Sequence, residues 1–211
     1  MSGFFDGTLT FGTTPSLVTA GGLDCWVAKL TADATPIWAV RFGGTGNDRG
    51  AQVVVDSAGD VYVAGNFQDQ IAFDAVNLVS AGMSDVFVAK LRGTNGSVIW
   101  ATSLGSSGED AVSDIAIHAA GRLIVSGGIS GPLSPGEAYA GGTDAFVVAF
   151  EETGVRRWAK IIGASGNDGS SAVSAGTDAI YAGVSVSGAV DLGVPLIGAG
   201  SPTGLLLKIE P

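Results

Sequence analysis

The stretch Ala81-Gly82-Met83-Ser84-Asp85-Val86-Phe87-Val88-Ala89-Lys90-Leu91 decides the fold, because the chain repeats it about every 60 residues. It joins a turn of small residues, one aspartate and a continuous apolar run. A short apolar run bounded by turn residues is typical of a buried β-strand. Copies of the stretch begin at Ala20 and Ala140, and a worn copy runs from Ala199 to Ile209. In the worn copy we expect Gly204 at the place of the aspartate.

Two further markers recur with the same period. One is a glycine-rich loop that ends in an aspartate, and the other is a tryptophan placed a few residues before that loop. The loops are Gly46-Asn47-Asp48, Gly108-Glu109-Asp110 and Gly166-Asn167-Asp168, and the tryptophans are Trp38, Trp100 and Trp158. Several markers that keep one order indicate a repeated supersecondary unit rather than a repeated motif. We expect the tryptophans to pack between neighbouring units.

One unit contains four short strand patterns and no helical period. The first two patterns are joined by the turn Asp56-Ser57-Ala58-Gly59-Asp60, and the last two by a turn that contains Asn95-Gly96. A longer polar segment, 66–84, separates the second pattern from the third. The expected strands are residues 52–55, 61–65, 86–91 and 98–104. Four short antiparallel strands in each repeat predict one blade of a β-propeller.

The sequence therefore predicts an all-β fold, a β-propeller built from four-stranded antiparallel blades, with about 3.5 blade equivalents in the chain. We expect one repeat domain over 1–211, because a single blade is stable only when neighbours bury its faces. Its expected parts are a partial blade at 1–42, blades at 43–104 and 105–162, and a partial blade at 163–211. The first part should supply the long segment and the third and fourth strands, and the last part the first three strands.

Three segments together resemble the bacterial seven-bladed β-propeller repeat family: Gly43–Gly50, Val55–Asn66 and Ser84–Leu91. The resemblance covers almost the whole chain. It implies the propeller fold and an exported or surface-associated protein, and it implies no catalytic residue. The third copy departs most from the pattern, since Ile117–Arg122 replaces the Asp-Ser-Ala-Gly-Asp turn.

Composition narrows the class of partner. The formal net charge is −10 with ten Lys and Arg, so we expect no nucleic acid partner, because phosphate binding needs clustered basic residues. No apolar run reaches the ~20 residues of a spanning helix, so we expect no membrane insertion. An acidic, lysine-poor, glycine-rich sequence favours an extracellular or cell-surface bacterial protein. Met1 leads directly into Ser2-Gly3-Phe4-Phe5 without a signal peptide, so we expect a piece of a longer exported protein.

The candidate binding residues are two sets of recurrent aspartates. Loops alternate between the two ends of an antiparallel sheet, so the glycine-rich loop and the long segment should share one face with the variable segments Phe67–Ser80 and Ile129–Tyr139. The candidates are Asp24, Asp85 and Asp144 before the third strands, and Asp48, Asp110 and Asp168 in the glycine-rich loops. The alternative is that these side chains fix turns by accepting bonds from their own backbone, and recurrence in every blade favours it.

Other chemistry has weaker support in the sequence. Gly43–Asp48 resembles a calcium nonapeptide, but that motif needs tandem copies, so we expect no metal and no cofactor. His118, the one histidine, is expected in an exposed turn, and nothing indicates a nucleophile beside it. Cys25 is expected to be a small buried apolar residue.

The leading interpretation is a non-enzymatic binding or scaffold module whose ligand is a protein or a carbohydrate. Phe67, Phe73 and Tyr139 are the candidates for stacking against a sugar. The alternative is a structural repeat that assembles through its open blade ends into rings or filaments. A homo-oligomer is expected in either case, for example a dimer that completes one ring of about seven blades. A propeller hydrolase or lyase is the third interpretation.

Overall fold

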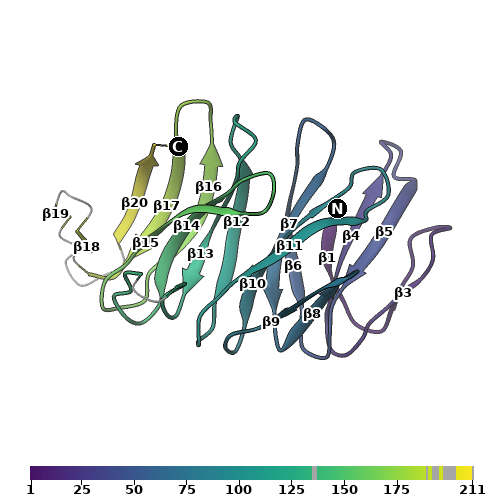
Figure 1. Ribbon diagram of the computed structural model, residues 1–211, viewed down its shortest axis with the longest axis horizontal. Helices are drawn as coiled ribbons and strands as arrows, with labels where there is room; N and C mark the ends of the chain where they lie inside the picture. Colours follow the sequence, from purple (N-terminus) through teal and green to yellow (C-terminus); the bar gives the residue numbers. More distant parts are fainter. Residues whose placement is uncertain (135–136, 189, 192–194, 197–202, 211) are drawn as a thin grey trace. The chain divides into compact units, whose positions relative to one another are not determined.

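The computed structural model describes residues 1–134, 137–188, 190–191, 195–196 and 203–210, and over these ranges the chain is all-β without a helix (Figure 1). The chain forms two compact units, Met1–Leu104 and Gly105–Pro211. Their boundary coincides with the predicted boundary between the second and third segments. Each unit contains one complete blade and one incomplete blade.

The complete blade of unit 1 has the four predicted strands. They are β6 (Arg49–Val55), β7 (Val61–Phe67), β10 (Asp85–Leu91) and β11 (Val98–Leu104). All pairs are antiparallel and the order across the sheet is β6-β7-β10-β11, which is the order along the chain (Figure 1). This meander confirms the blade predicted from the repeat.

The long segment between β7 and β10 contains a hairpin that the sequence pattern did not predict, formed by β8 (Gln70–Phe73) and β9 (Val76–Val79). Ile71 and Phe73 are fully buried. The ring of Phe73 stacks on Phe42, with centroids 4.7 Å apart. Equivalent small hairpins pair β2 (Thr8–Leu9) with β3 (Leu17–Val18), and β18 (Val190–Asp191) with β19 (Pro195–Leu196).

The incomplete blade of unit 1 has the order β1-β4-β5, formed by β1 (Ser2–Phe5), β4 (Asp24–Leu30) and β5 (Pro36–Phe42). The expectation that the chain opens in the long segment is wrong, because β1 occupies the place of the end of a second strand. Phe5 pairs with Asp24 as Phe67 pairs with Asp85. This blade lacks its first strand and half of its second within the described residues.

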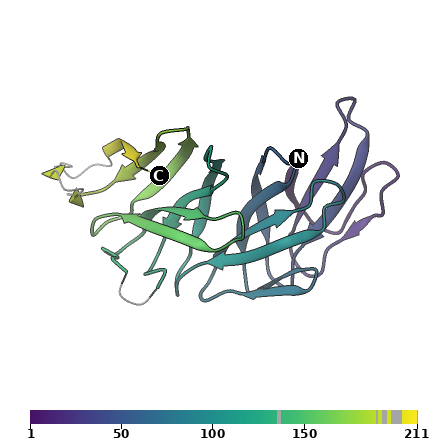
Figure 2. The same cartoon turned by 45° about the horizontal axis from the view of Figure 1, so that its top comes forward.

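Unit 2 also contains one complete and one incomplete blade, but along the chain the complete blade comes first (Figure 2). The complete blade contains β12 (Ala111–Ile117), β13 (Leu123–Ile129), β14 (Asp144–Phe150) and β15 (Arg156–Ile162). The incomplete blade contains β16 (Gly169–Ala175), β17 (Ile180–Val186) and β20 (Thr203–Ile209). The part of the worn copy from 199 to 202 lies outside the described residues. Because Val186 pairs with Thr203, Thr203 and not Gly204 takes the aspartate's place, which corrects the expected alignment.

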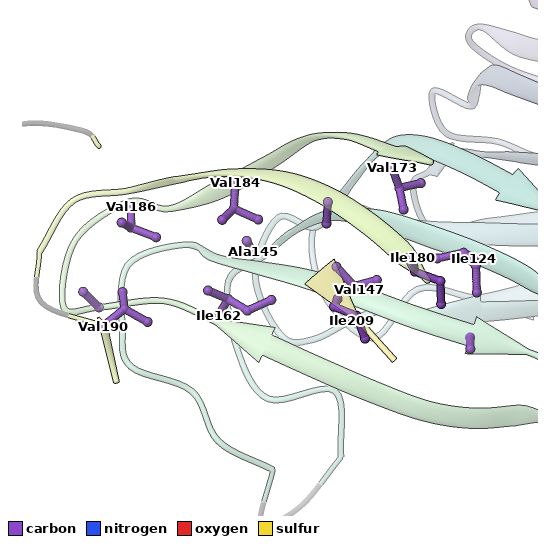
Figure 3. Packing of buried hydrophobic residues seen from close by; sticks show 13 residues of the cluster. Ile124, Ala145, Val147, Ile162, Val173, Ile180, Val184, Val186, Val190 and Ile209 are labelled. Carbon is purple, nitrogen blue, oxygen red and sulfur yellow. The ribbon is translucent and has the colours of Figure 1, made fainter. Parts of the chain in front are cut away.

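The core lies where blades face one another. All seven residues of β10 and of β14 are buried, as expected for strands covered on both faces. In unit 2, Val147, Ile180 and Ile209 from three different strands gather in one cluster (Figure 3). Burial of each such side chain stabilises the fold by about 1.5–3 kcal/mol.

The predicted packing of a tryptophan between blades holds for Trp38 in unit 1. Its side chain is 7% exposed, and its Nε1 donates a hydrogen bond to the Gly93 carbonyl oxygen in the next blade, at 3.2 Å. The tryptophan therefore joins the two blades of unit 1 by burial and by one polar contact.

Candidate functional site

The aspartate at the start of each complete third strand closes the loop that precedes it. Asp24, Asp85 and Asp144 are 0%, 2% and 1% exposed. In each case Oδ2 accepts a hydrogen bond from the backbone N–H of the residue four positions earlier. The donors are Ala20 at 2.9 Å, Ala81 at 2.9 Å and Ala140 at 2.6 Å. A short acidic side chain is well suited to this local bond, which fixes the turn into the strand.

The aspartate of each glycine-rich loop bridges two loops. Asp48, Asp110 and Asp168 are buried, and Oδ2 of each accepts a bond from an N–H four residues earlier: Gly44 at 2.8 Å, Ser106, and Ala164 at 2.6 Å. Oδ1 of each accepts a bond from the backbone just after the second strand: Gln68 at 3.3 Å, Ser130 at 2.8 Å and Ser187 at 2.5 Å. Each carboxylate therefore ties the loop between blades to the long segment of its own blade.

The two kinds of loop meet in each unit. The N–H of Asp48 donates to the Leu23 carbonyl oxygen at 2.6 Å, and the N–H of Asp168 donates to that of Thr143 at 2.5 Å. The Leu23 N–H in turn donates to Asn47 Oδ1 at 3.2 Å. Within each unit, this confirms the prediction that the glycine-rich loop and the long segment lie at the same end of the sheet.

All six predicted aspartates thus lie in these loops, with their carboxylates engaged by backbone N–H groups. The structure brings Asp24 close to Asp48, and Asp144 close to Asp168, so that each pair repels. Asp85 belongs to unit 1 and Asp110 to unit 2. Contact of these carboxylates with a ligand stays a prediction.

The pairs of buried acids have shifted protonation. Burial raises the pKa of Asp48 from 3.8 to about 6, and the negative charge of Asp24 adds to this effect. The N–H groups of Gly44 and Gln68 oppose it by stabilising the charged form. Burial also raises the pKa of Asp144, with a further contribution from Asp168. Burial therefore makes the charged form of these two loop carboxylates less stable than it is in water.

Two glycines are required by the closeness of these carboxylates. A Cβ at Gly43 would lie 2.2 Å from Cγ of Asp24, and a Cβ at Gly163 would lie 2.0 Å from Oδ1 of Asp144. Such distances leave no room for any side chain. The glycine that follows the fourth strand is therefore part of the same loop structure.

The candidate binding site is a polar pocket beside Asp24, which we call the Arg41 pocket. It has a volume of about 330 Å³ and is lined by four polar side chains and four small residues: Arg41, Thr45, Gln70 and Asn77, with Ala20, Gly43, Gly44 and Ala72. Nη1 of Arg41 forms an ion pair with Oδ2 of Asp24, and the arginine side chain is 29% exposed. A guanidinium among amide and hydroxyl groups is suited to a carboxylate or amide group of a ligand.

The repeat pattern did not indicate Arg41, because this residue does not recur in the other blades. Strand pairing places Arg41 opposite Trp26 in β4. At the same place in the other blades, Ser103 lies opposite Phe87 and Ile161 lies opposite Phe146. The charge of Arg41 could have indicated it, because the residues at this place in the other two blades are neutral.

The aromatic residues expected to stack on a sugar are mostly unavailable, so that expectation is wrong for two of them. Phe67 and Phe73 are fully buried, because the unpredicted hairpin turns this part of the long segment onto the core. Tyr139 is half-buried, and its hydroxyl donates to the Gly142 carbonyl oxygen at 2.7 Å.

The expectation of an exposed His118 is also wrong, since this residue is 4% exposed. Its Nδ1 accepts the Ala120 N–H at 3.1 Å, as Oδ1 of Asp56 accepts the Ala58 N–H at 3.0 Å. The histidine therefore takes the turn-fixing place of the aspartate. Cys25 is buried as predicted, and burial raises the pKa of its thiol.

Two further features concern metal binding and membrane-spanning helices. In the part of the chain that the structure describes, no three His, Cys, Asp or Glu side chains gather in a group fit for a metal ion. Over the same residues, the chain forms no helix with the length and apolarity to cross a bilayer.

No family model matches the chain. A curated protein similar to it is an uncharacterized WD repeat-containing protein, L264, of Acanthamoeba polyphaga mimivirus. The two are 23% identical over 171 residues, which is 65% of this chain and 12% of the viral protein. The chain thus spans about an eighth of the length of that relative. The likeness agrees with the propeller blades seen in the structure. Membership of a bacterial seven-bladed family stays a prediction.

Proposed function

We propose that the chain is a non-enzymatic binding or scaffold module, and that it binds a protein partner through the Arg41 pocket at a bacterial cell surface. The observation that carries the proposal is the departure of Arg41 from the repeat. The buried aspartates recur because they fix the loops of successive blades, whereas Arg41 adds a cation at this place to one of the three blades whose fourth strand the structure describes. In this proposal the six aspartates form the frame, and side chains between them contact the ligand.

Three observations support a protein over the other ligands. The similar viral protein is named for WD repeats, a propeller repeat that carries scaffolds. Two of the three aromatic side chains that were expected to stack on a sugar are buried. The pocket offers charge and amide donors, which suit the carboxylate or amide side chains of a peptide. The acidic composition supports the surface location.

The test is a selection of peptides from a random displayed library on the intact chain. Selected peptides are then measured by calorimetry against Arg41→Ser, which installs the residue that the second blade has at this place. We expect enrichment of peptides with Asp, Glu, Asn or Gln, and a loss of affinity of about tenfold or more in the variant.

The matched control is Arg122→Ser, which removes an arginine from a turn of unit 2, at the end of the sheet opposite the loops. Its affinity should equal that of the unchanged chain. Equal losses in both variants would mean that general charge, and not the pocket, attracts the peptides. Specific binding on a glycan array that Arg41→Ser leaves unchanged would favour a carbohydrate ligand instead.

A second candidate function, assembly into rings or filaments, is favoured by the last blade. Among the described residues β20 pairs with β17 alone. Leu206 on this strand is 75% exposed. A cavity of about 320 Å³ is lined by Leu207 and Ile209 of the same strand and by Ile162 of β15, among others. Light scattering over a range of concentrations tests this: a mass that rises with concentration supports assembly, and a constant monomer mass contradicts it.

A further inference from the structure

The hairpin β8–β9 presents one of its two faces to solvent. Burial alternates along both strands, so that every second residue is exposed. Strand pairing sets Gln70 opposite Val79 and Ala72 opposite Asn77, and all four are exposed. Side chains directly opposite each other in an antiparallel pair point to the same side of the sheet. We call the surface formed by Gln70, Ala72, Asn77 and Val79 the hairpin face.

The hairpin face continues the Arg41 pocket. Three of its residues, Gln70, Ala72 and Asn77, line that pocket together with Arg41. The fourth residue, Val79, is the direct neighbour of Gln70 across the hairpin, and its side chain is 70% exposed. The polar pocket is therefore bordered by an exposed aliphatic side chain.

Backbone contacts fix the hairpin face at three points. At the tip of the hairpin, Oδ2 of Asp74 accepts the N–H of the first residue of β11 at 3.2 Å. At the base, the Ser80 N–H donates to the Asp69 carbonyl oxygen at 2.8 Å. Between them, the Ala72 N–H donates to the Gly43 carbonyl oxygen of the preceding loop at 3.4 Å. A surface that is fixed before binding loses less conformational entropy when a ligand binds.

The charges around the hairpin face favour one acidic group in a ligand. A guanidinium carries several N–H donors, and the ion pair of Arg41 with Asp24 uses Nη1, so Arg41 can donate to a ligand as well. Asp69 and Asp74, at the two ends of the hairpin, are both exposed. Their charges repel a second acidic group on the ligand. The ligand side chain that lies over Val79 is therefore expected to be uncharged.

Strand geometry sets the spacing between these two points of contact. Asn77 and Val79 are two residues apart in β9, so their side chains lie about 7 Å apart on the same side of the strand. Side chains two positions apart in an extended peptide have the same spacing and also point to one side. An extended peptide along β9 with an acidic residue beside Asn77 and Arg41 would place the side chain two positions away over Val79.

We propose that the Arg41 pocket and the hairpin face together recognise an extended peptide in which an acidic residue and an aliphatic residue are two positions apart. The acidic side chain accepts hydrogen bonds from Arg41, and the aliphatic side chain packs on Val79. This inference rests on the peptide binding proposed above. It adds Val79 as the residue that determines which side chain is accepted next to the acid.

The experiment titrates short synthetic peptides into the intact chain and follows the titration by NMR. Each peptide consists of glycine and serine with one aspartate and one leucine, which are adjacent, two positions apart or three positions apart, in both orders. We expect the spacing of two to bind about fivefold more tightly than the other spacings, and than a peptide with serine in place of leucine. The amide signals of Gln70 and Val79 should shift on binding.

Variants of the exposed valine test its role without disturbing the core. Val79→Ser should weaken binding of the peptide with a spacing of two by about fivefold, and should leave binding of the serine peptide unchanged. Val79→Lys should instead favour a peptide with a second aspartate in place of leucine. The matched control is Val55→Ser, because Val55 is 60% exposed in the same unit and ends β6 at the other end of the sheet. It should bind every peptide as the unchanged chain does.

The outcomes separate this inference from the function on which it rests. Equal affinity for all spacings, or no effect of Val79→Ser, would overturn the inference. Library peptides that depend on Arg41 but carry no aliphatic residue two positions from an acid would also overturn it, and the proposed function would stand. If neither the synthetic peptides nor the library yields a binder, both proposals fail.

Discussion

Asp24 in unit 1 and Asp144 in unit 2 have the same place in their blades and different electrostatic surroundings. Each is buried at the start of a third strand, and each accepts the N–H of the residue four positions earlier. Arg41 forms an ion pair with Asp24, whereas the residue in its place in the other blade is Ile161. The loop closes in both cases. The aspartate therefore closes the loop with or without a cation beside it, and the recognition role proposed for Arg41 is separate from loop closure.

The largest effect is expected from removing a bridging carboxylate in the blade without the arginine. Asp168 accepts three bonds, from the N–H of Ala164 and from the N–H and hydroxyl of Ser187. Asp168→Ala would leave buried donors unpaired, so the free energy of unfolding in urea should fall by about 4 kcal/mol. Asp178→Ala, at an exposed position of the same unit, should change it by less than about 0.5 kcal/mol. Similar losses of unfolding free energy in Asp168→Ala and Asp178→Ala would contradict the claim that Asp168 holds its two loops together.

The second effect concerns pH and unit 1. The pKa of Asp48 is about 6 in the folded chain and 3.8 ordinarily, so the folded state binds this proton more tightly. Its contribution to stability is full below about pH 3.8 and is lost as the pH rises through about 6, by up to about 3 kcal/mol. Asp48→Asn removes the titration. Urea unfolding at several pH values should show a steeper fall in stability for the unchanged chain than for the variant, and parallel curves would refute the shift.

The third effect tests whether both units need the same glycine. Gly163→Ala should lower the free energy of unfolding by about 2 kcal/mol, because its methyl group would meet the carboxylate of Asp144. Gly43→Ala should cost as much beside Asp24. Gly169→Ala is the control, since a Cβ there meets nothing within 4 Å. A tolerated alanine at Gly163 alone would show that the blade without the arginine has a looser loop.

The smallest effect is expected at the opposite turns. In the complete blade of unit 1, Asp56 pairs with Lys90, and in that of unit 2 the same places are held by His118 and Ala149. The double variant His118→Asp with Ala149→Lys should recreate the ion pair. A double-mutant cycle on thermal unfolding should give a favourable coupling of about 0.5–1 kcal/mol. A coupling of zero would show that the two turns differ in more than these residues.

The sequence was informative where residues recur. The continuous apolar runs of the third strands predicted full burial. The alternation of loops in an antiparallel meander correctly placed the two loops at the same end of the sheet. The sequence was less informative where packing against the rest of the fold, and not the local pattern of residues, decides the structure. The hairpin that contains Ile71 and Phe73 has strands of four residues, too short to show a period within a polar segment.

The same competition explains the other corrections. His118 was expected in solvent because turns are usually exposed, but its ring accepts a turn N–H and is covered. Arg41 carries no local motif at all. Strand register places Arg41 opposite Trp26, and from there its side chain reaches Asp24, two residues earlier in β4. Arg41 also lines a pocket with Gln70, a residue of the next blade.

Amide hydrogen exchange at the residues whose N–H groups donate to the six aspartates tests most directly whether buried carboxylates hold the loops. These residues lie in loops, where amides ordinarily exchange fast. We expect Ala20, Gly44, Ala140 and Ala164 to exchange about 100-fold or more slowly than an exposed turn amide such as that of Thr13. If these amides exchange as fast as exposed loop amides, whether or not the aspartates are present, the claim that buried carboxylates hold these loops in place is contradicted.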